Sequence, residues 1–404
     1  MELFETFLSD TEKDYVKKAS DFGKKHFAEK NITNWYFEGG IPDDVMWSYK
    51  KSGLGYMGFP KDFGGMEISL AAQMAIIEEL SRIAATALPL NSQALSNHII
   101  SILANESQLK AFVKQYEDTA RPIGSVAFSD VGSGSDMRSY KTAVSKEGNK
   151  LVLNGSKAFI TNGMFTPVFF VLAKDLAETG DANDVSFSVW AVPRNTSGVS
   201  VYPTKMIGQR ANSTANAVFK DVELSSDMQL GNKSMIREQI NHVMNIGRLI
   251  ASASSLGMAQ AAFEDSVKFA SNHRIGNEQM WDFQQIGLML TQMQSKLISM
   301  RAHIYNAAVS IESKDYPGLW NSVAKYYVPQ TGVDVASMAM QIMGSRGYES
   351  SSRVGRIWRD IRGNQYASGT DQAAVNLAAK QIIKRSLAQQ EQSNYTGLKD
   401  NQDI

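Results

Sequence analysis

The hydrophobic periodicity of this chain changes twice, and the order of the changes limits the folds that it can adopt. Residues 74–88 and 240–270 carry apolar side chains at three- and four-residue spacings, which is typical of helices. Between them lie short β-rich runs, such as 150–155 and 167–175, separated by Gly, Asn, Asp and Pro. A helical segment, a β-rich segment and a second helical segment follow one another in a single chain.

We therefore predict an α+β fold that is mainly helical. Its parts are an N-terminal helical domain at 1–121, an antiparallel β domain at 122–232 and a bundle of four long helices at 233–404. The small residues of 251–262 (ASASSLGMAQAA) allow close helix packing, or else leave room for a bulky ligand. From about Gln390 the tail is polar, and we expect a frayed end or an arm for oligomer contacts.

Composition removes several classes of chemistry. The 404 residues include no cysteine, which excludes disulfides, thiolate nucleophiles, iron-sulfur clusters and cysteine-ligated zinc. The five histidines are dispersed, so we expect no metal site. The 41 basic and 41 acidic residues balance, which gives no support for nucleic acid or a membrane as a partner. No signal peptide or membrane-spanning run is visible, so we expect a cytoplasmic protein.

Two linked segments carry the functional signal. In the first, 127–136 (AFSDVGSGSD), glycines such as Gly134 free the backbone to approach a ligand, and Ser135 offers a hydroxyl and an amide. A Rossmann dinucleotide site is disfavoured because Met137 replaces the third glycine of its motif. In the second, Phe159 and Thr161 lie two residues apart in a strand-like run, so both would face one side and suit a flavin ring. A core aromatic beside an exposed threonine would explain the same spacing.

Together these segments resemble the two-part signature of acyl-CoA dehydrogenases, a Thr-Glu-Pro-x-x-Gly-Ser-Asp loop followed by Asn-Gly-x-Lys-x-(aromatic)-Ile-Thr-Asn. The resemblance implies the family's fold, with FAD between the small β domain and the helical bundle, and action on an acyl thioester. Phe159 would pack against the flavin, Thr161 would bond near its N5 atom, and Phe128 and Ser129 would contribute from the preceding loop. Similar stretches cover nearly the whole chain: 53–82, 104–113, 208–224 and 341–370.

The resemblance implies further contacts with FAD. Arg274 matches an arginine that binds the FAD pyrophosphate, although the Phe-Gly that usually follows reads Gly276-Asn277 here. A surface arginine at a helix end would be the plainer explanation. The remaining matches imply at least a homodimer, or a homotetramer, in which one copy contacts the FAD of another. They are Gln341, Gly344, Ser345, Thr370 and Gln372, of which Thr370 could also be a simple helix cap. Gln284 matches the glutamine that follows the arginine in the family.

The usual catalytic base is missing. Family members remove the α proton with a glutamate before the Gly-Thr of the final loop, and that position is Ser368. Other branches place the glutamate just before an arginine on the helix that begins the C-terminal domain, and there Gly247 precedes Arg248. A serine hydroxyl is no comparable base without a partner. Other candidate bases are Asp371, Glu78, Glu79 and His242. Asp371 is the nearest to the final loop, although a solvated carboxylate in the first turn of a helix would also explain it.

Three explanations of the missing glutamate stay open at this point. Another group serves as base; or the substrate needs little help, or the flavin does different redox work; or catalysis is lost. We therefore expect an FAD-dependent oxidoreductase acting on the acyl part of a CoA or carrier-protein thioester, by α,β-dehydrogenation or related chemistry in a specialised pathway. Its electron acceptor would be electron-transfer flavoprotein or oxygen. The alternative is a non-catalytic flavin or acyl-thioester binding protein, and an FAD-free interaction protein is disfavoured.

Overall fold

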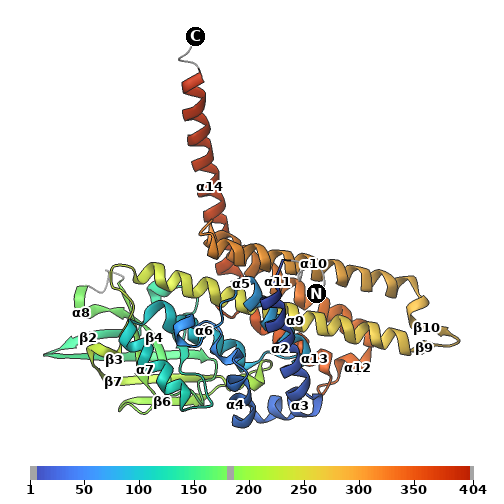
Figure 1. Ribbon diagram of the computed structural model, residues 1–404, viewed down its shortest axis with the longest axis horizontal. Coiled ribbons are helices and arrows are strands. Elements are labelled where there is room, and N and C mark those ends of the chain that lie inside the picture. Colours follow the sequence, from blue (N-terminus) through green and yellow to red (C-terminus); the bar gives the residue numbers. More distant parts are fainter. Residues whose placement is uncertain (1–6, 180–185, 401–404) are drawn as a thin grey trace.

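The computed structural model describes residues 7–179 and 186–400. Helices of the N-terminal part lie against a β-sheet at one end of the molecule, and the long C-terminal helices extend away from the sheet to the other end (Figure 1). This arrangement confirms the predicted order of helical, β and helical parts. Within the described residues, no helix is both long and apolar enough to cross a lipid bilayer.

From residue 7 onward, where the structure describes it, the N-terminal part contains six helices and two short 3₁₀ turns. Side-chain caps fix several helix starts: Ser9 and Glu12 form a capping box at α2, and Asn105 and Gln108 form one at α7. Two of the helices, α5 and α6, are buried along most of their length and join this part to the rest of the molecule. The helices are α2 (Asp10–His26), α3 (Glu29–Glu38), α4 (Asp43–Lys51), α5 (Leu70–Ala84), α6 (Pro89–Leu103) and α7 (Glu106–Glu117), with turns at Leu54–Tyr56 and Lys61–Phe63.

The β part forms one sheet in the order β6-β7-β3-β2-β4-β5-β8, with β1 paired to β4. The β domain was predicted to be antiparallel, and most of its strand pairs are, but β4 runs parallel to both β1 and β2. The cause is the segment 161–167, which carries the chain from the end of β3 across to the far side of the β2–β3 hairpin. The strands are β1 (Ser125–Ala127), β2 (Ala143–Glu147), β3 (Lys150–Ile160), β4 (Val168–Asp175), β5 (Phe187–Pro193), β6 (Val199–Pro203), β7 (Ala215–Leu224) and β8 (Gln229–Leu230), and a short helix α8 (Leu176–Thr179) follows β4.

The C-terminal part contains four long helices. Close packing explains part of its small-residue stretch, because a Cβ on Gly257 would lie 2.1 Å from the backbone oxygen of Glu78 on α5. The polar tail, for which a frayed end or an arm for oligomer contacts was expected, is helical to Asp400, and its helix projects from the body (Figure 1). The elements are α9 (Ile236–Asn272), β9 (Arg274–Ile275), β10 (Glu278–Gln279), α10 (Gln284–Glu312), α11 (Pro317–Met343), α12 (Ser345–Tyr348), α13 (Arg353–Asn364) and α14 (Asp371–Asp400).

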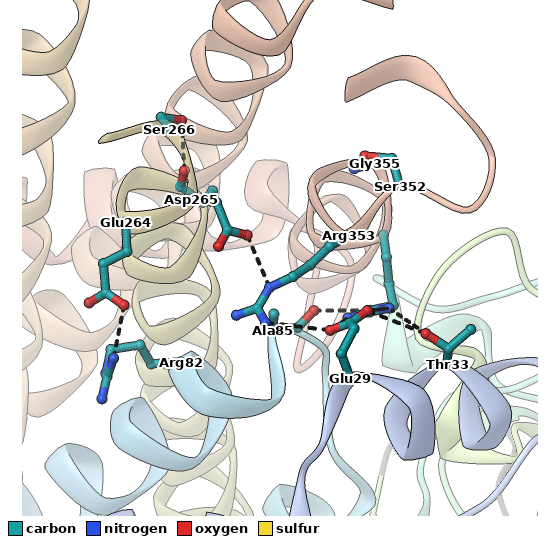
Figure 2. Close-up of polar contacts among 12 residues, drawn as sticks. Glu29, Thr33, Arg82, Ala85, Glu264, Asp265, Ser266, Ser352, Arg353 and Gly355 are labelled. Carbon is teal, nitrogen blue, oxygen red and sulfur yellow. Dashed lines mark hydrogen bonds and ion pairs between the residues drawn. The ribbon is translucent and has the colours of Figure 1, made fainter. Parts of the chain in front are cut away.

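Ion pairs fix α13 against its neighbours, as Figure 2 shows. Arg356 donates to both carboxylate oxygens of Glu29, at 2.8 and 2.9 Å, and to the backbone oxygen of Ala85 at 3.2 Å. Arg353 forms an ion pair with Asp265 of α9 at 3.0 Å. A two-pronged arginine contact holds geometry better than a single ion pair, so these contacts set the angle at which α13 enters the core.

The carboxylate of Asp360 on α13 joins all three parts of the chain. It is fully buried, and it accepts hydrogen bonds from the Tyr36 hydroxyl at 3.1 Å and the Thr86 hydroxyl at 2.6 Å. Backbone amides of Ala87, at 3.0 Å, and Gln209, at 2.5 Å, also donate to it. Tyr36 of α3 and the α5–α6 connection supply the first three donors, and the β part supplies the fourth, so one side chain fixes the relative positions of these parts.

We expect Asp360→Asn to destabilise the protein by about 3 kcal/mol, because the amide turns an N–H toward buried donors that need an acceptor. Urea unfolding measures the change. The matched control is Tyr36→Phe, which removes one of the four donors and should cost about 1 kcal/mol. Equal stabilities of Asp360→Asn and wild type would contradict the role given to Asp360.

Candidate functional site

A buried ion pair holds the loop at 128–136 onto the sheet. The Lys157 ammonium lies 2.6 Å from Asp130 Oδ1 and donates to the backbone oxygen of Phe128 at 2.8 Å. Asp130 Oδ2 accepts the amides of Lys141 and Thr142, at 2.6 and 2.8 Å. Burial lowers the pKa of Lys157 to about 8. Neither Lys157 nor Asp130 was among the expected site residues, although a lysine inside a largely buried strand requires such a partner.

The loop presents open backbone to solvent. A Cβ built on Gly132 or Gly134 would meet no atom of the described chain within 4 Å. Gly134 and Ser135 are exposed, whereas Ser129 is half-buried and Phe128 is buried. The exposed glycines and the Ser135 hydroxyl can therefore approach a phosphate or carbonyl, which fits the pyrophosphate and ring of a flavin dinucleotide.

Phe159 stands out from the sheet. Its side chain is 64% exposed and its φ is 56°, at an irregularity in the pairing of β3 with β7. Its amide is held by Asn216 Oδ1 at 3.1 Å. Thr161 lies just past the end of β3, so the strand alternation that was expected to align it with Phe159 does not apply. An exposed aromatic on a strained backbone is suited to covering a flat ligand.

The final loop before α14 lies next to the 128–136 loop. The hydroxyls of Ser135 and Thr370 are 3.4 Å apart. Thr370 Oγ1 also accepts the amide of Ala373 at 3.2 Å, so it caps α14 while facing Ser135. Ser368 and Gly369 both adopt left-handed backbone, with φ of 54° and 100°. Gln372 is exposed in the first turn of α14.

The two positions at which a catalytic glutamate was expected meet in space. A Cβ built on Gly247 would lie 2.7 Å from Ser368 Oγ and 3.5 Å from Leu95 Cδ2 of α6. The lack of a side chain at Gly247 thus lets the Ser368 side chain lie against α9. Neither position supplies a carboxylate.

The other carboxylates considered as bases are all engaged. Asp371 Oδ1 lies 3.2 Å from the Lys325 ammonium, and its Oδ2 accepts the Gln365 amide at 2.8 Å. Glu78 pairs with Arg301, and Glu79 pairs with Arg82 at 2.8 Å. A carboxylate held by a cation is a weaker proton acceptor. His242 is half-buried on α9, and burial lowers its pKa.

Arg248 brings positive charge next to these positions. Its guanidinium donates to Asn245 Oδ1 at 2.9 Å, and it forms no ion pair with a carboxylate in the part of the chain that the structure describes. Burial lowers the pKa of Arg248 to about 10. The buried ammonium of Lys325 is close enough for the two cations to repel each other, and its pKa is lowered, chiefly by burial. One acid, Asp371, accompanies two cations, so this region favours an anion.

The remaining expected FAD contacts lie at the other end of the molecule. Arg274 follows α9, and at 1.5 Å per residue it is about 40 Å from Gly247. Figure 1 shows β9 and β10 at the end far from the sheet. Because α10 and α11 run back and forth along α9, Gln284, Gln341, Gly344 and Ser345 lie at that same far end. One chain thus divides the expected residues into two distant groups.

We expect Lys157→Met to lower stability by about 3 kcal/mol and to weaken FAD uptake, because it leaves Asp130 buried without its cation and releases the 128–136 loop. Urea unfolding and FAD titration measure both effects. The control is Lys150→Met on the same strand, whose exposed pair with Glu223 should contribute less than about 1 kcal/mol. Equal losses in the two variants would contradict this assignment.

Comparison with known protein families matches the chain in three consecutive segments. They correspond to the N-terminal domain of acyl-CoA dehydrogenase at residues 9–117, the middle domain at 125–222 and the C-terminal domain at 237–383. The probable acyl-CoA dehydrogenase YdiO of Escherichia coli strain K12 is 29% identical over 360 residues, which cover 89% of this chain and 93% of that protein.

Solved structures are similar over nearly the whole chain. An acyl-CoA dehydrogenase from Slackia heliotrinireducens is 35% identical, with a TM-score of 0.84 over 95% of this chain and 99% of that one. Butyryl-CoA dehydrogenase from Megasphaera elsdenii is 23% identical, with a TM-score of 0.84 over 93% and 99% of the two chains. The prolyl acyl carrier protein oxidase AnaB, at 22% identity and a TM-score of 0.84 over 93% and 99%, shares the fold.

Proposed function

The chain belongs to the acyl-CoA dehydrogenase family, and we propose that it is an FAD-dependent oxidoreductase acting on the acyl part of a CoA or carrier-protein thioester. The observation that carries the proposal is that the final loop contacts both Gly247 of α9, through Ser368, and Ser135 of the 128–136 loop, through Thr370. When bound, FAD would accept a hydride from the acyl β carbon. The residues that would hold it in this subunit are Phe128, Ser129, Gly134, Ser135, Phe159 and Thr161.

The α proton is the difficult part of such a reaction. Among the described residues Ser368 has no hydrogen-bond partner to take its proton, and Asp371 is paired with Lys325. We therefore propose a substrate whose α carbon is already acidic. The positive charges of Arg248 and Lys325 would stabilise the negative charge that develops as the proton leaves.

We also propose that the protein works as a homodimer or homotetramer. Arg274 lies about 40 Å from Gly247 along α9, farther than one extended FAD reaches, so it would bind the FAD of a neighbouring copy. Gln284, Gln341, Gly344 and Ser345 lie at the same end. The proposed electron acceptor is electron-transfer flavoprotein or oxygen, and the proposed location is the cytoplasm.

A second candidate function is a flavin or acyl-thioester binding protein without catalysis. One observation favours it: both base positions lack a carboxylate, and the nearby acids are engaged in ion pairs. The fold is the same in the two cases, so the site chemistry must separate them.

Anaerobic visible spectroscopy of the FAD-loaded protein separates these functions. We expect bleaching of the flavin when a panel of acyl-CoA and acyl-carrier-protein thioesters includes a substrate with an acidic α carbon. Spectral perturbation without bleaching by every thioester would support the binding protein. A purified protein that takes up no FAD would contradict both functions.

The second test introduces a base. We expect Ser368→Glu to raise the rate of dehydrogenation of simple acyl-CoAs by about 100-fold or more, because a positioned general base contributes on that scale. Ser368→Gln is the control, since it has the same shape without the base. Flavin bleaching rates give the comparison, and equal rates for the two variants would exclude a missing base as the limiting factor.

A further inference from the structure

A buried polar cluster lies one helical turn from the point where α6 meets the proposed reaction site. Leu95 of α6 marks that point, because its Cδ2 lies 3.5 Å from a Cβ built on Gly247. Asn91 precedes Leu95 by four residues, so it shares a face of α6 with Leu95 and lies about 6 Å farther along the helix. Asn91 therefore lies one helical turn from the site, on the face of α6 that carries Leu95.

The cluster joins three helices. The Asn91 amide donates to the Ser81 hydroxyl of α5 at 3.4 Å, and Ser81 donates to the Ser254 hydroxyl of α9 at 3.3 Å. The three residues are 8%, 0% and 3% exposed in the order named. A structural contact between the helices would account for these two hydrogen bonds. It does not account for the Asn91 oxygen or for the Ser254 hydroxyl proton, which take part in neither bond.

At each end of the cluster one hydrogen-bonding capacity is unused: the Asn91 oxygen accepts no hydrogen bond, and the Ser254 hydroxyl accepts from Ser81 but donates to no described residue. Asn91 Oδ1 is buried and accepts no hydrogen bond within the described residues. Ser254 is also unlike the other serines of α9: Ser252, Ser255, Ser266 and Ser271 each donate to the carbonyl four residues back, whereas Ser254 donates to no described residue. Each buried polar group without a partner costs about 1–3 kcal/mol. The cluster thus offers one free acceptor and one free donor.

Exposure along α9 indicates which way an acyl chain would run. Glu238 and Asn241, before Gly247, are exposed, whereas every residue from Leu249 to Ala259 is buried. A thioester must leave its CoA or carrier protein outside, so its carrier would lie toward the exposed end of α9. The acyl chain would then run past Gly247 toward Ser254 and Asn91.

We propose that the acyl group handled at this site carries an uncharged polar group, a hydroxyl or a carboxamide, near its far end. That group donates to Asn91 Oδ1 and accepts from the Ser254 hydroxyl. A plain alkyl chain leaves both unpaired, and a carboxylate would face the Asn91 oxygen without a donor. This inference rests on the proposed function and adds the class of the acyl group to it.

The test compares matched ligands on the FAD-loaded wild type. Pantetheine thioesters of pentanoate and hexanoate are titrated beside their ω-hydroxy counterparts, since the pantetheine arm is common to CoA and carrier proteins. The change in the flavin spectrum gives the dissociation constants. We expect the ω-hydroxy ligand of at least one pair to bind about 10-fold or more tightly, because a site with buried polar groups rejects the analogue that lacks the hydroxyl.

Variants then assign the preference to the cluster. Asn91→Leu and Ser254→Ala should each reduce the preference for the ω-hydroxy ligand to about threefold or less. Ser252→Ala, which removes a hydroxyl bonded to its own helix, is the matched control and should retain the preference. FAD content and the thermal unfolding midpoint show whether each variant is folded. If Asn91→Leu does not fold, the smaller change Ser254→Ala still tests the cluster.

Equal binding of both ligands in every wild-type pair, or a preference that survives in both cluster variants, would overturn the inference and leave the proposed function intact. Binding of the alkyl thioesters without binding of their ω-hydroxy counterparts would likewise overturn the inference and leave the proposed function intact. A flavin spectrum that no thioester changes would instead overturn the proposed function together with the inference.

Discussion

The buried carboxylate of Asp360 is the interaction on which the placement of the whole site depends. Four donors from the N-terminal helices and the β part converge on it, so the three parts of the chain share one acceptor. Four residues later, Asn364 ends α13 and donates to the Ser255 hydroxyl of α9 at 2.9 Å. The final loop begins there, so the docking of α13 sets where Ser368 meets Gly247.

The site itself combines rigid anchoring with strained, open backbone. The buried ion pair of Lys157 and Asp130 anchors the 128–136 loop to the sheet, and burial makes this pair costly to break. Phe159 and Ser368 keep left-handed backbone conformations that residues other than glycine rarely adopt. Such conformations persist only where their surroundings fix them, which supports a ligand-binding role for this face of the molecule.

Local sequence patterns predicted the parts of this fold that depend on local structure. The helical, β and helical order followed from periodicity, and the signature segments indicated which loops to compare. The parallel pairing of β4 with β2 could not be predicted, because it depends on how the segment after β3 crosses the hairpin. The positive φ of Phe159 was missed for a similar reason, since the irregularity arises from pairing with β7.

Long-range contacts explain the rest of what the sequence left open. Asp371 reads as a solvated carboxylate from its position in a first helical turn, yet Lys325, 46 residues earlier, reaches it in the core. Glu78 likewise meets Arg301 across 223 residues. Periodicity and spacing describe neighbours within a segment, so they cannot identify partners that only packing brings together.

The absence of a glutamate changes the electrostatics of the site as well as its proton chemistry. A carboxylate at position 247 or 368 would add negative charge beside Arg248, in a region where Asp371 already serves Lys325. Without it, the half-buried guanidinium of Arg248 forms no ion pair with a carboxylate within the described residues. Buried positive charge stabilises an anion more strongly than charge in water does, because the surroundings screen it less. These charges support the proposal that the site holds a negative charge on the ligand rather than taking a proton from it, and that its acyl groups have an α carbon that is acidic before they bind.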